Sequence, residues 1–281
     1  MQVILAKHAG TCFGVNRALV AANKALKDPS SVSCLGPLIH NPQVVRDLAM
    51  RGLDVVESPE DIWTRRVIIR SHGVAPDVRH ALEDSDAEII DATCPFVLRA
   101  QEAAARLGRE QECVIIVGEA GHPEVEALEA FAGEGGARVI CALGQEDLPE
   151  DLPDRVGIVV QTTQRTSILD AVLETLKSRG IETDVANTIC NATTRRQDAA
   201  MDLASQVDAM VVVGGRNSSN TKRLAEICSS ICPNVFHIEN LNDFTDEDLI
   251  ALSSCTKIGL TAGASTPEDQ IRTVRLGLEA L

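Results

Sequence analysis

The stretch DATCPFVLRAQ, residues 91–101, places a cysteine directly before a predicted helix. Pro95 follows Cys94, and proline is favoured in the first helical turn because its missing N–H would have no partner there. The thiol of Cys94 is therefore expected at the positive end of a helix, where a thiolate is stabilised. Taken alone, Cys94 is most simply interpreted as a structural thiol. The alternative roles are a catalytic nucleophile and a metal ligand.

The surroundings of Cys94 recur at two other cysteines, Cys12 and Cys190, which also precede helical patterns. Each of the three cysteines has an arginine five residues later, and these are Arg17, Arg99 and Arg195. A polar residue that opens the next helix follows each cysteine by 28 residues, and these are His40, His122 and Ser218. A third polar position follows at a more variable spacing and holds His72, Thr162 and Ser265. The chain is therefore predicted to contain three copies of one unit.

Short apolar runs alternate with longer helical patterns along the whole chain. The runs predicted as strands are residues 2–6, 66–70, 113–118, 155–160, 208–214 and 257–262. The alternation indicates an α/β fold with parallel sheets, and the apolar runs are typical of strands buried on both faces. We predict three similar α/β units, with small parallel sheets arranged around a pseudo-threefold axis. Their boundaries are expected at residues 1–93, 94–189 and 190–281.

Such an arrangement would bring the three cysteines together at the centre, because ligands collect at the carboxyl ends of parallel strands. A disulfide uses two cysteines, and a structural zinc site usually needs four ligands at short spacing, whereas the chain has no CxxC pair. Three thiolates can hold a four-iron cluster and leave one iron open as a Lewis acid. On spacing alone, a cluster and buried structural cysteines remain equally supported. The other six cysteines are interpreted as packing residues: Cys34, Cys113, Cys141, Cys228, Cys232 and Cys255.

The repeated polar positions are typical of an anion pocket, since hydroxyls, amides and the N–H groups at helix N-termini bind phosphate. Ser218, Ser219 and Asn220 lie between GGRN and a predicted helix, although each alone would serve equally as a helix N-cap. Glu124, two residues after His122, is either a surface residue of a first helical turn or a proton relay. The hydroxyls of Thr162 and Thr163 are candidates for orienting it.

Composition narrows the class of partner. The net charge of −15 and the aromatic content of 2% argue against nucleic-acid binding, which relies on basic surfaces and stacking platforms. No run of about 18 apolar residues predicts a membrane span. The N-terminal run is predicted as a strand rather than a signal peptide, and nine cysteines without a secretory signal indicate a reducing, cytoplasmic location.

The motifs together resemble those of the LytB family of 4-hydroxy-3-methylbut-2-enyl diphosphate reductases. They are, in order, GTCFGVNRA, IHNPQVV, RSHGV, DATCP, GHPEV, QTT, TICNATTRRQ, GGRNSSNTKRL and TAGAS, and they run from Cys12 to about Ser265. The resemblance implies a 4Fe-4S iron–sulfur cluster held by Cys12, Cys94 and Cys190, with one open iron. It implies a diphosphate pocket of His40, His72, His122, Ser218, Ser219, Asn220 and Ser265. It also implies that Glu124 relays protons with His122, and that Thr162 lies near the substrate hydroxyl.

The reaction implied by the resemblance is removal of the allylic hydroxyl with two electrons and two protons, giving isopentenyl and dimethylallyl diphosphates. This is the last step of the methylerythritol phosphate route to isoprenoids, and a ferredoxin or flavodoxin would supply the electrons. Two residues beside the ligands depart from the usual family motifs, namely Thr11 in GTC and Asn191 after Cys190.

Two other functions stay open at this point. One is a three-cysteine iron–sulfur dehydratase or synthase resembling quinolinate synthase, whose dicarboxylate pocket would be expected to contain more arginine. The other is a cluster-based redox sensor, which would need neither Glu124 nor a phosphate pocket.

Overall fold

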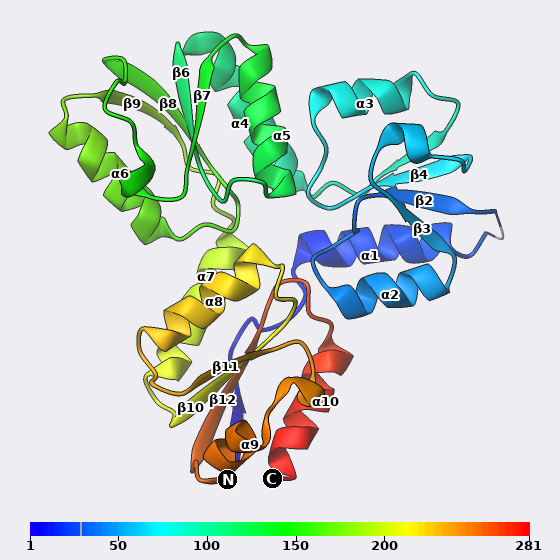
Figure 1. The fold of residues 1–281 in the computed structure, drawn as a ribbon, viewed down its shortest axis with the longest axis vertical. Helices are drawn as coiled ribbons and strands as arrows, with labels where there is room; N and C mark the ends of the chain where they lie inside the picture. Colours follow the sequence, from blue (N-terminus) through cyan, green and yellow to red (C-terminus); the bar gives the residue numbers. More distant parts are fainter. Residues whose placement is uncertain (29) are drawn as a thin grey trace. The chain divides into compact units, whose positions relative to one another are not determined.

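The computed structural model describes residues 1–28 and 30–281, and it contains three four-stranded sheets whose strands all run parallel (Figure 1). The first sheet consists of β2 (Val32–Leu35), β3 (Leu53–Val56), β4 (Arg66–Ile69) and β5 (Glu88–Asp91). The second consists of β6 (Cys113–Val117), β7 (Arg138–Ala142), β8 (Arg155–Val160) and β9 (Glu182–Ala186). The third consists of β10 (Ala209–Val213), β11 (Val235–Ile238), β12 (Lys257–Ala262) and β1 (Gln2–Leu5). The predicted α/β class with small parallel sheets is confirmed.

The three sheets have the same strand order. It is β3-β2-β4-β5 in the first, β7-β6-β8-β9 in the second and β11-β10-β12-β1 in the third. The three sheets are therefore copies of one unit, as the repeat of cysteines and polar positions predicted. Their arrangement around a pseudo-threefold axis stays a prediction.

The unit boundaries differ from the expected ones at the N-terminal strand. β1 was expected within the first unit, residues 1–93, but it pairs with β12 in the third sheet, with Gln2 opposite Lys257. In the other two units a strand follows the last helix and pairs beside the third strand. The third unit ends in α10 (Glu268–Glu279), so β1 takes the place of that fourth strand.

The chain divides into two compact units, one of residues 1–15, 40–43 and 191–281, and one of residues 16–39 and 44–190. We name these the terminal unit and the central unit. The terminal unit holds the third sheet together with α7 (Asn191–Ala204), α8 (Ser219–Ser229), η3 (Leu241–Asp243), α9 (Asp246–Ser253) and α10. Alternate residues of β10 enter two core layers: Val211 packs with Ile271 of α10, and Val212 packs with Leu224 of α8.

The central unit holds the first and second sheets. The helices beside the first sheet are α2 (Pro42–Met50), η1 (Pro59–Asp61), α3 (Pro76–Glu83) and most of α1 (Phe13–Ala25). The second sheet has α4 (Pro95–Glu110), α5 (Pro123–Glu134), η2 (Gln145–Asp147) and α6 (Thr166–Ser178). Ile116 of β6 packs with Leu107 and Leu128 of α4 and α5, whereas Ile115 packs toward Leu169 of α6. Within the described part of the chain, no helix has both the length and the apolar content needed to span a membrane.

Candidate functional site

The three repeated cysteines occupy equivalent positions relative to the sheets. The backbone N–H of each cysteine donates to a carbonyl just beyond the end of an inner strand. The strands are β12 for Cys12, β4 for Cys94 and β8 for Cys190, and in each case the acceptor is the second residue after the strand. The bonds are Cys12 N to Ala264 O (3.1 Å), Cys94 N to Ser71 O (3.0 Å) and Cys190 N to Thr162 O (2.9 Å). One backbone arrangement therefore fixes all three cysteines at the carboxyl edges of parallel strands.

Each of these cysteines also directly precedes a helix, α1, α4 or α7, as predicted. Cys94 is the N-cap of α4, and Pro95 begins the helix. The sulfur of Cys12 accepts a hydrogen bond from the N–H of Val15 at 3.5 Å, as an N-cap side chain does. The N-terminus of a helix favours negatively charged groups, and it is a position at which metal-binding cysteines are commonly found.

The other six cysteines are unsuited to that role. Burial raises the pKa of Cys34 and Cys228 to about 12 and that of Cys141 to about 11. Burial also raises the pKa of Cys113 and Cys255. Cys232 is buried, and its thiol donates to the carbonyl of Asn234 at 3.5 Å. The five thiols whose pKa burial raises stay protonated near neutral pH, and the Cys232 thiol is bonded to a backbone carbonyl, which leaves Cys12, Cys94 and Cys190 as the thiols suited to an iron–sulfur cluster.

The central unit brings a carboxylate, a hydroxyl and two imidazoles together. Glu124 is 2% exposed and accepts two hydrogen bonds from Thr162, from its N–H at 2.6 Å and from its hydroxyl at 2.9 Å. His122 is the N-cap of α5, and its Nδ1 accepts from the N–H of Glu124 at 3.1 Å, so the neutral ring carries its proton on Nε2. The ring of His72 lies edge-on to that of His122, with centroids 5.6 Å apart.

The terminal unit brings together the serine and asparagine positions. Ser218 is the N-cap of α8 and accepts from the N–H of Thr221, and Ser219 and Asn220 follow it as buried residues. The side-chain amide of Asn220 is 4% exposed, and neither its oxygen nor its nitrogen has a hydrogen-bond partner among the described residues. Unpaired buried amides are costly, so both groups of this amide are available to a ligand.

The segment around His40 also belongs to the terminal unit. The hydroxyl of Ser265 donates to the carbonyl of His40 at 2.8 Å, and the amide of Asn41 donates to the carbonyl of Ser265 at 2.9 Å. Asn41 is 1% exposed and also donates to Gln270 at 3.0 Å. Asn41 was not predicted as a site residue, although its place inside the IHNPQVV motif was an available signal.

The predicted site residues thus form two groups. The terminal unit contains Cys12, His40, Ser218, Ser219, Asn220 and Ser265. The central unit contains Cys94, Cys190, His72, His122, Glu124, Thr162 and the half-buried Thr163. Across residues 1–28 and 30–281, no three or more His, Cys, Asp or Glu side chains lie close enough together to hold a metal ion. The convergence of the three thiols on one cluster therefore stays a prediction.

Comparison with known proteins gives concordant matches over nearly the whole chain. A profile of the LytB protein family matches residues 3–279. A 4-hydroxy-3-methylbut-2-enyl diphosphate reductase from Geobacter sp. (strain M21) is 46% identical over 271 residues, covering 95% of this chain and 93% of that protein. The reductase of the same name from Geobacter sulfurreducens is 44% identical over 268 residues, covering 95% and 93%.

Two solved structures are also similar. One is (E)-4-hydroxy-3-methyl-but-2-enyl diphosphate reductase, described as the terminal enzyme of the non-mevalonate pathway, with 39% identity, a TM-score of 0.70 and 100% of both chains covered. The other is the E-1-hydroxy-2-methyl-but-2-enyl-4-diphosphate reductase from Plasmodium falciparum, with 27% identity and a TM-score of 0.87. That match covers 97% of this chain and 86% of the other.

Proposed function

The chain belongs to the LytB protein family, and from this premise we propose that it reduces 4-hydroxy-3-methylbut-2-enyl diphosphate. In this oxidoreductase reaction the allylic C–O bond breaks and a C–H bond forms. Two electrons and two protons are consumed, and water leaves. The products are isopentenyl and dimethylallyl diphosphates, which makes this the terminal step of the non-mevalonate pathway.

We assign the 4Fe-4S cluster to Cys12, Cys94 and Cys190, whose helix N-terminal positions suit thiolate ligands. When bound, the cluster would supply electrons one at a time and a Lewis-acidic iron that carries no protein ligand. A ferredoxin or flavodoxin is the proposed donor of those electrons. Five of the remaining cysteines are poor candidates because burial raises the pKa of their thiols, and Cys232 is buried with its thiol bonded to a backbone carbonyl.

The observation that carries the proposal is the position of Thr162. Its N–H and hydroxyl hold the carboxylate of Glu124, while its carbonyl accepts the N–H of Cys190. A buried proton-carrying group is thereby joined through one residue to a proposed cluster ligand. We assign Glu124 as the proton donor to the leaving hydroxyl, with the Thr162 hydroxyl, 2.9 Å away, as the intermediate carrier.

The polar groups of both units are assigned to the diphosphate. In the terminal unit, Ser218, Ser219 and Asn220 lie at the N-terminus of α8, where backbone N–H groups and the helix dipole favour an anion. A phosphate oxygen would give the buried Asn220 amide the acceptor that its nitrogen needs. His40 and Ser265 complete this group, and His72 and His122 contribute from the central unit.

The decisive test is turnover without oxygen. The purified protein is assayed for iron and sulfide, and then incubated with the hydroxylated allylic diphosphate and either dithionite with a viologen or reduced ferredoxin. Formation of the two five-carbon diphosphates is expected. A cluster-loaded protein that forms neither product would overturn the proposal.

Glu124→Gln tests the proton relay without disturbing the packing. The glutamine oxygen can still accept the N–H of Thr162, and its nitrogen can donate to the Thr162 hydroxyl, so the fold and the cluster spectrum should be unchanged. Loss of a general acid is expected to lower kcat by about 10²- to 10⁴-fold. Glu126→Gln is the matched control, because Glu126 is an exposed residue in the same first turn of α5. Full activity in Glu124→Gln would refute the assigned role.

A further inference from the structure

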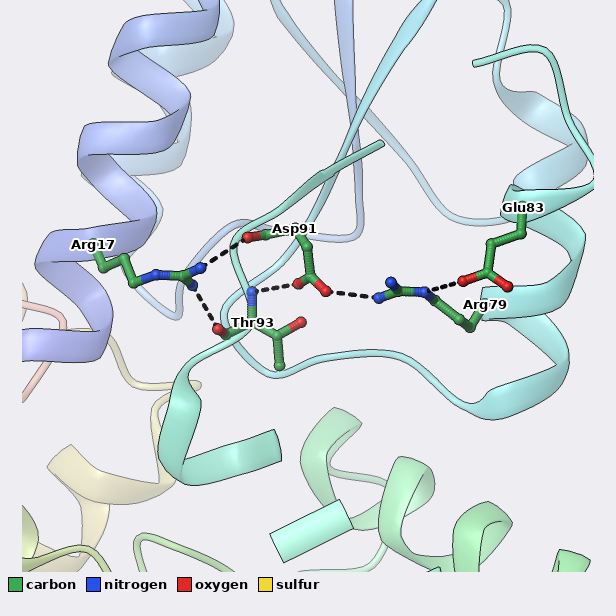
Figure 2. Close-up of polar contacts among 5 residues, drawn as sticks. All are labelled: Arg17, Arg79, Glu83, Asp91 and Thr93. Atoms are coloured by element: carbon green, nitrogen blue, oxygen red, sulfur yellow. Dashed lines mark hydrogen bonds and ion pairs between the residues drawn. The ribbon is translucent and has the colours of Figure 1, made fainter. Parts of the chain in front are cut away.

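A chain of polar contacts surrounds the segment that leads into Cys94 (Figure 2). Arg17 comes from α1, Arg79 and Glu83 come from α3, and Asp91 is the last residue of β5. Thr93 is the residue directly before Cys94. All of these residues belong to the central unit, and none has a part in the proposed reaction.

Arg17 binds the backbone of this segment rather than a side chain. Its Nη1 donates to the carbonyl of Thr93 at 2.7 Å, and its Nη2 donates to the carbonyl of Asp91 at 3.3 Å. The planar fork of a guanidinium suits two carbonyls at a fixed separation, whereas a lysine ammonium acts as a single point charge. The contact therefore specifies the path of the backbone from Asp91 to Thr93.

The consequence for Cys94 is that the peptide group before it is held at both ends. Its carbonyl, that of Thr93, accepts from Arg17, and its N–H donates to the carbonyl of Ser71 at 3.0 Å. On the other side, Pro95 restricts Cys94 to an extended conformation, and Cys94 has φ −63° and ψ 133°. The direction of the Cα–Cβ bond of Cys94 is thereby fixed, and the sulfur keeps only rotation about χ1.

A second set of contacts holds Thr93 from its other side. The carboxylate of Asp91 accepts the N–H of Thr93 at 2.9 Å through Oδ1 and accepts from Arg79 at 2.6 Å through Oδ2. Arg79 in turn donates to Glu83, one turn further along α3, at 2.7 Å. Both backbone groups of Thr93 therefore have fixed partners, and α1 and α3 are linked through the segment that carries Cys94.

We infer that Arg17 is a positioning residue for Cys94, holding the Thr93–Cys94 peptide so that the thiol keeps the direction needed of a ligand. The inference rests on the proposed function, because it takes Cys94 to be a cluster ligand. Preorganised ligands lose less entropy on binding. Loss of Arg17 is therefore expected to make the protein release iron faster.

The equivalent arginines of the other repeats provide a built-in comparison. Arg99 also follows its cysteine by five residues, but its guanidinium lies 5.6 Å from the ring centroid of Phe96 on the same helix. Arg195 lines a groove with Lys7 and His8. The same place in the repeat therefore gives different contacts, and Arg99→Gln is a matched control for Arg17→Gln.

The experiment compares Arg17→Gln, Arg17→Lys and Arg99→Gln with the unaltered chain in two measurements. In the metal-free protein, hydrogen exchange of peptides covering residues 91–98 and the alkylation rate of Cys94 report the order of the segment. In the reconstituted protein, the rate of iron release to a chelator reports ligand retention.

Loss of a charged hydrogen-bond donor predicts about tenfold faster exchange and iron release in Arg17→Gln. Arg17→Lys, which keeps the charge and one donor, should fold in any case and give intermediate rates, while Arg99→Gln should match the unaltered chain.

The outcomes separate this inference from the proposed function. If the unaltered chain loads no cluster, the proposed function fails, and exchange and alkylation still decide whether Arg17 orders the segment. If the cluster loads but Arg17→Gln releases iron at the unaltered rate, the positioning role is overturned. Equal effects of Arg17→Gln and Arg99→Gln would likewise overturn it, since they would show a general loss of helix stability.

Discussion

Asp91 links the acid stability of the protein to the segment before Cys94. Burial raises the pKa of this carboxyl group, but hydrogen bonds from Thr93 and Arg79 and the charge of Arg79 outweigh burial and leave the pKa below its ordinary value of 3.8. Because the folded pKa lies below the unfolded one, the unfolded chain binds more protons in acid. The contribution of Asp91 to stability is therefore complete above the unfolded pKa and is lost as pH falls through the folded pKa.

Asp91→Asn should consequently lower the free energy of unfolding at neutral pH and make little difference in strong acid. Denaturant unfolding of both chains, measured from about pH 7 down to about pH 3, checks this. The gap between the two curves should narrow as pH falls below about 4. A gap that stays constant over this range would show that Asp91 acts through packing rather than through its charge.

Single residues also show where reasoning from the sequence succeeds. Helix starts at Cys94, His122 and Ser218 were predictable, because an N-cap and its helix are neighbours in the chain. The role of Arg17 was not predictable, since its partners lie 74 and 76 residues away and are backbone carbonyls with no sequence signature. Repetition after each cysteine marked the position, but only the fold shows what the side chain contacts.

At the scale of elements, α4 and α5 of the central unit pack against each other and lie side by side against the second sheet (Figure 1). A Cβ atom on Gly108 of α4 would lie 2.1 Å from the carbonyl oxygen of Ala132 on α5. That oxygen belongs to the backbone, so it cannot move aside without shifting the helix. Glycine at this position therefore sets the distance between the two helices.

Gly108→Ala should destabilise the protein by about 1–3 kcal/mol, because the cost of overpacking exceeds the gain in helix propensity. Gly133→Ala is the control with the opposite sign. Gly133 is exposed on α5, and a Cβ atom there would meet only Val139, at 4.0 Å. Alanine at this position should therefore stabilise the protein by up to about 1 kcal/mol. Thermal and denaturant unfolding measure the change in stability for both variants. Stabilisation by Gly108→Ala would contradict the packing described.

The strands divide into those that the sequence reveals and those that it hides. All six runs predicted as strands are strands: β1, β4, β6, β8, β10 and β12. The inner strand β2 and the edge strands β3, β5, β7, β9 and β11 were not among them. These edge strands are mostly half-buried, as in EIID of β5 and ETDVA of β9, so they need no continuous apolar run. Five of the six inner strands therefore carry a continuous apolar run that marks them in the sequence, and β2 is the exception; among the edge strands only β1 was marked in this way.

For the whole molecule, the repeat predicted three copies of a unit, and the common strand order confirms them. The repeat could not predict where the first strand pairs, because β1 and β12 are separated by most of the chain. In the first unit the last helix, α3, leads to β5 through residues 84–87, and in the second α6 leads to β9 through residues 179–181. In the third unit, β1 takes the place of β5 and β9. It contacts α10, but no short loop joins α10 to it.

Joining Leu281 directly to Met1 would supply that connection. Three residues, Ala280, Leu281 and Met1, would then separate α10 from β1, the same number that separates α6 from β9. A circular permutant with this junction, and with new ends opened between the exposed Glu150 and Asp151, should keep all three sheets. Its melting temperature should fall by only a few degrees, because short surface connections change the loop entropy little.

Hydrogen exchange of β12 is the sharpest measurement of the permutant. Deletion of residues 1–6 is the control, because it removes the strand that covers one edge of β12. The deletion should strip protection from β12 while leaving β4 and β6 unchanged, since those strands lie in other sheets. The permutant should protect β12 as the unaltered chain does. Exposure of β12 in the permutant would show that β1 does not act as the fourth strand of the third unit.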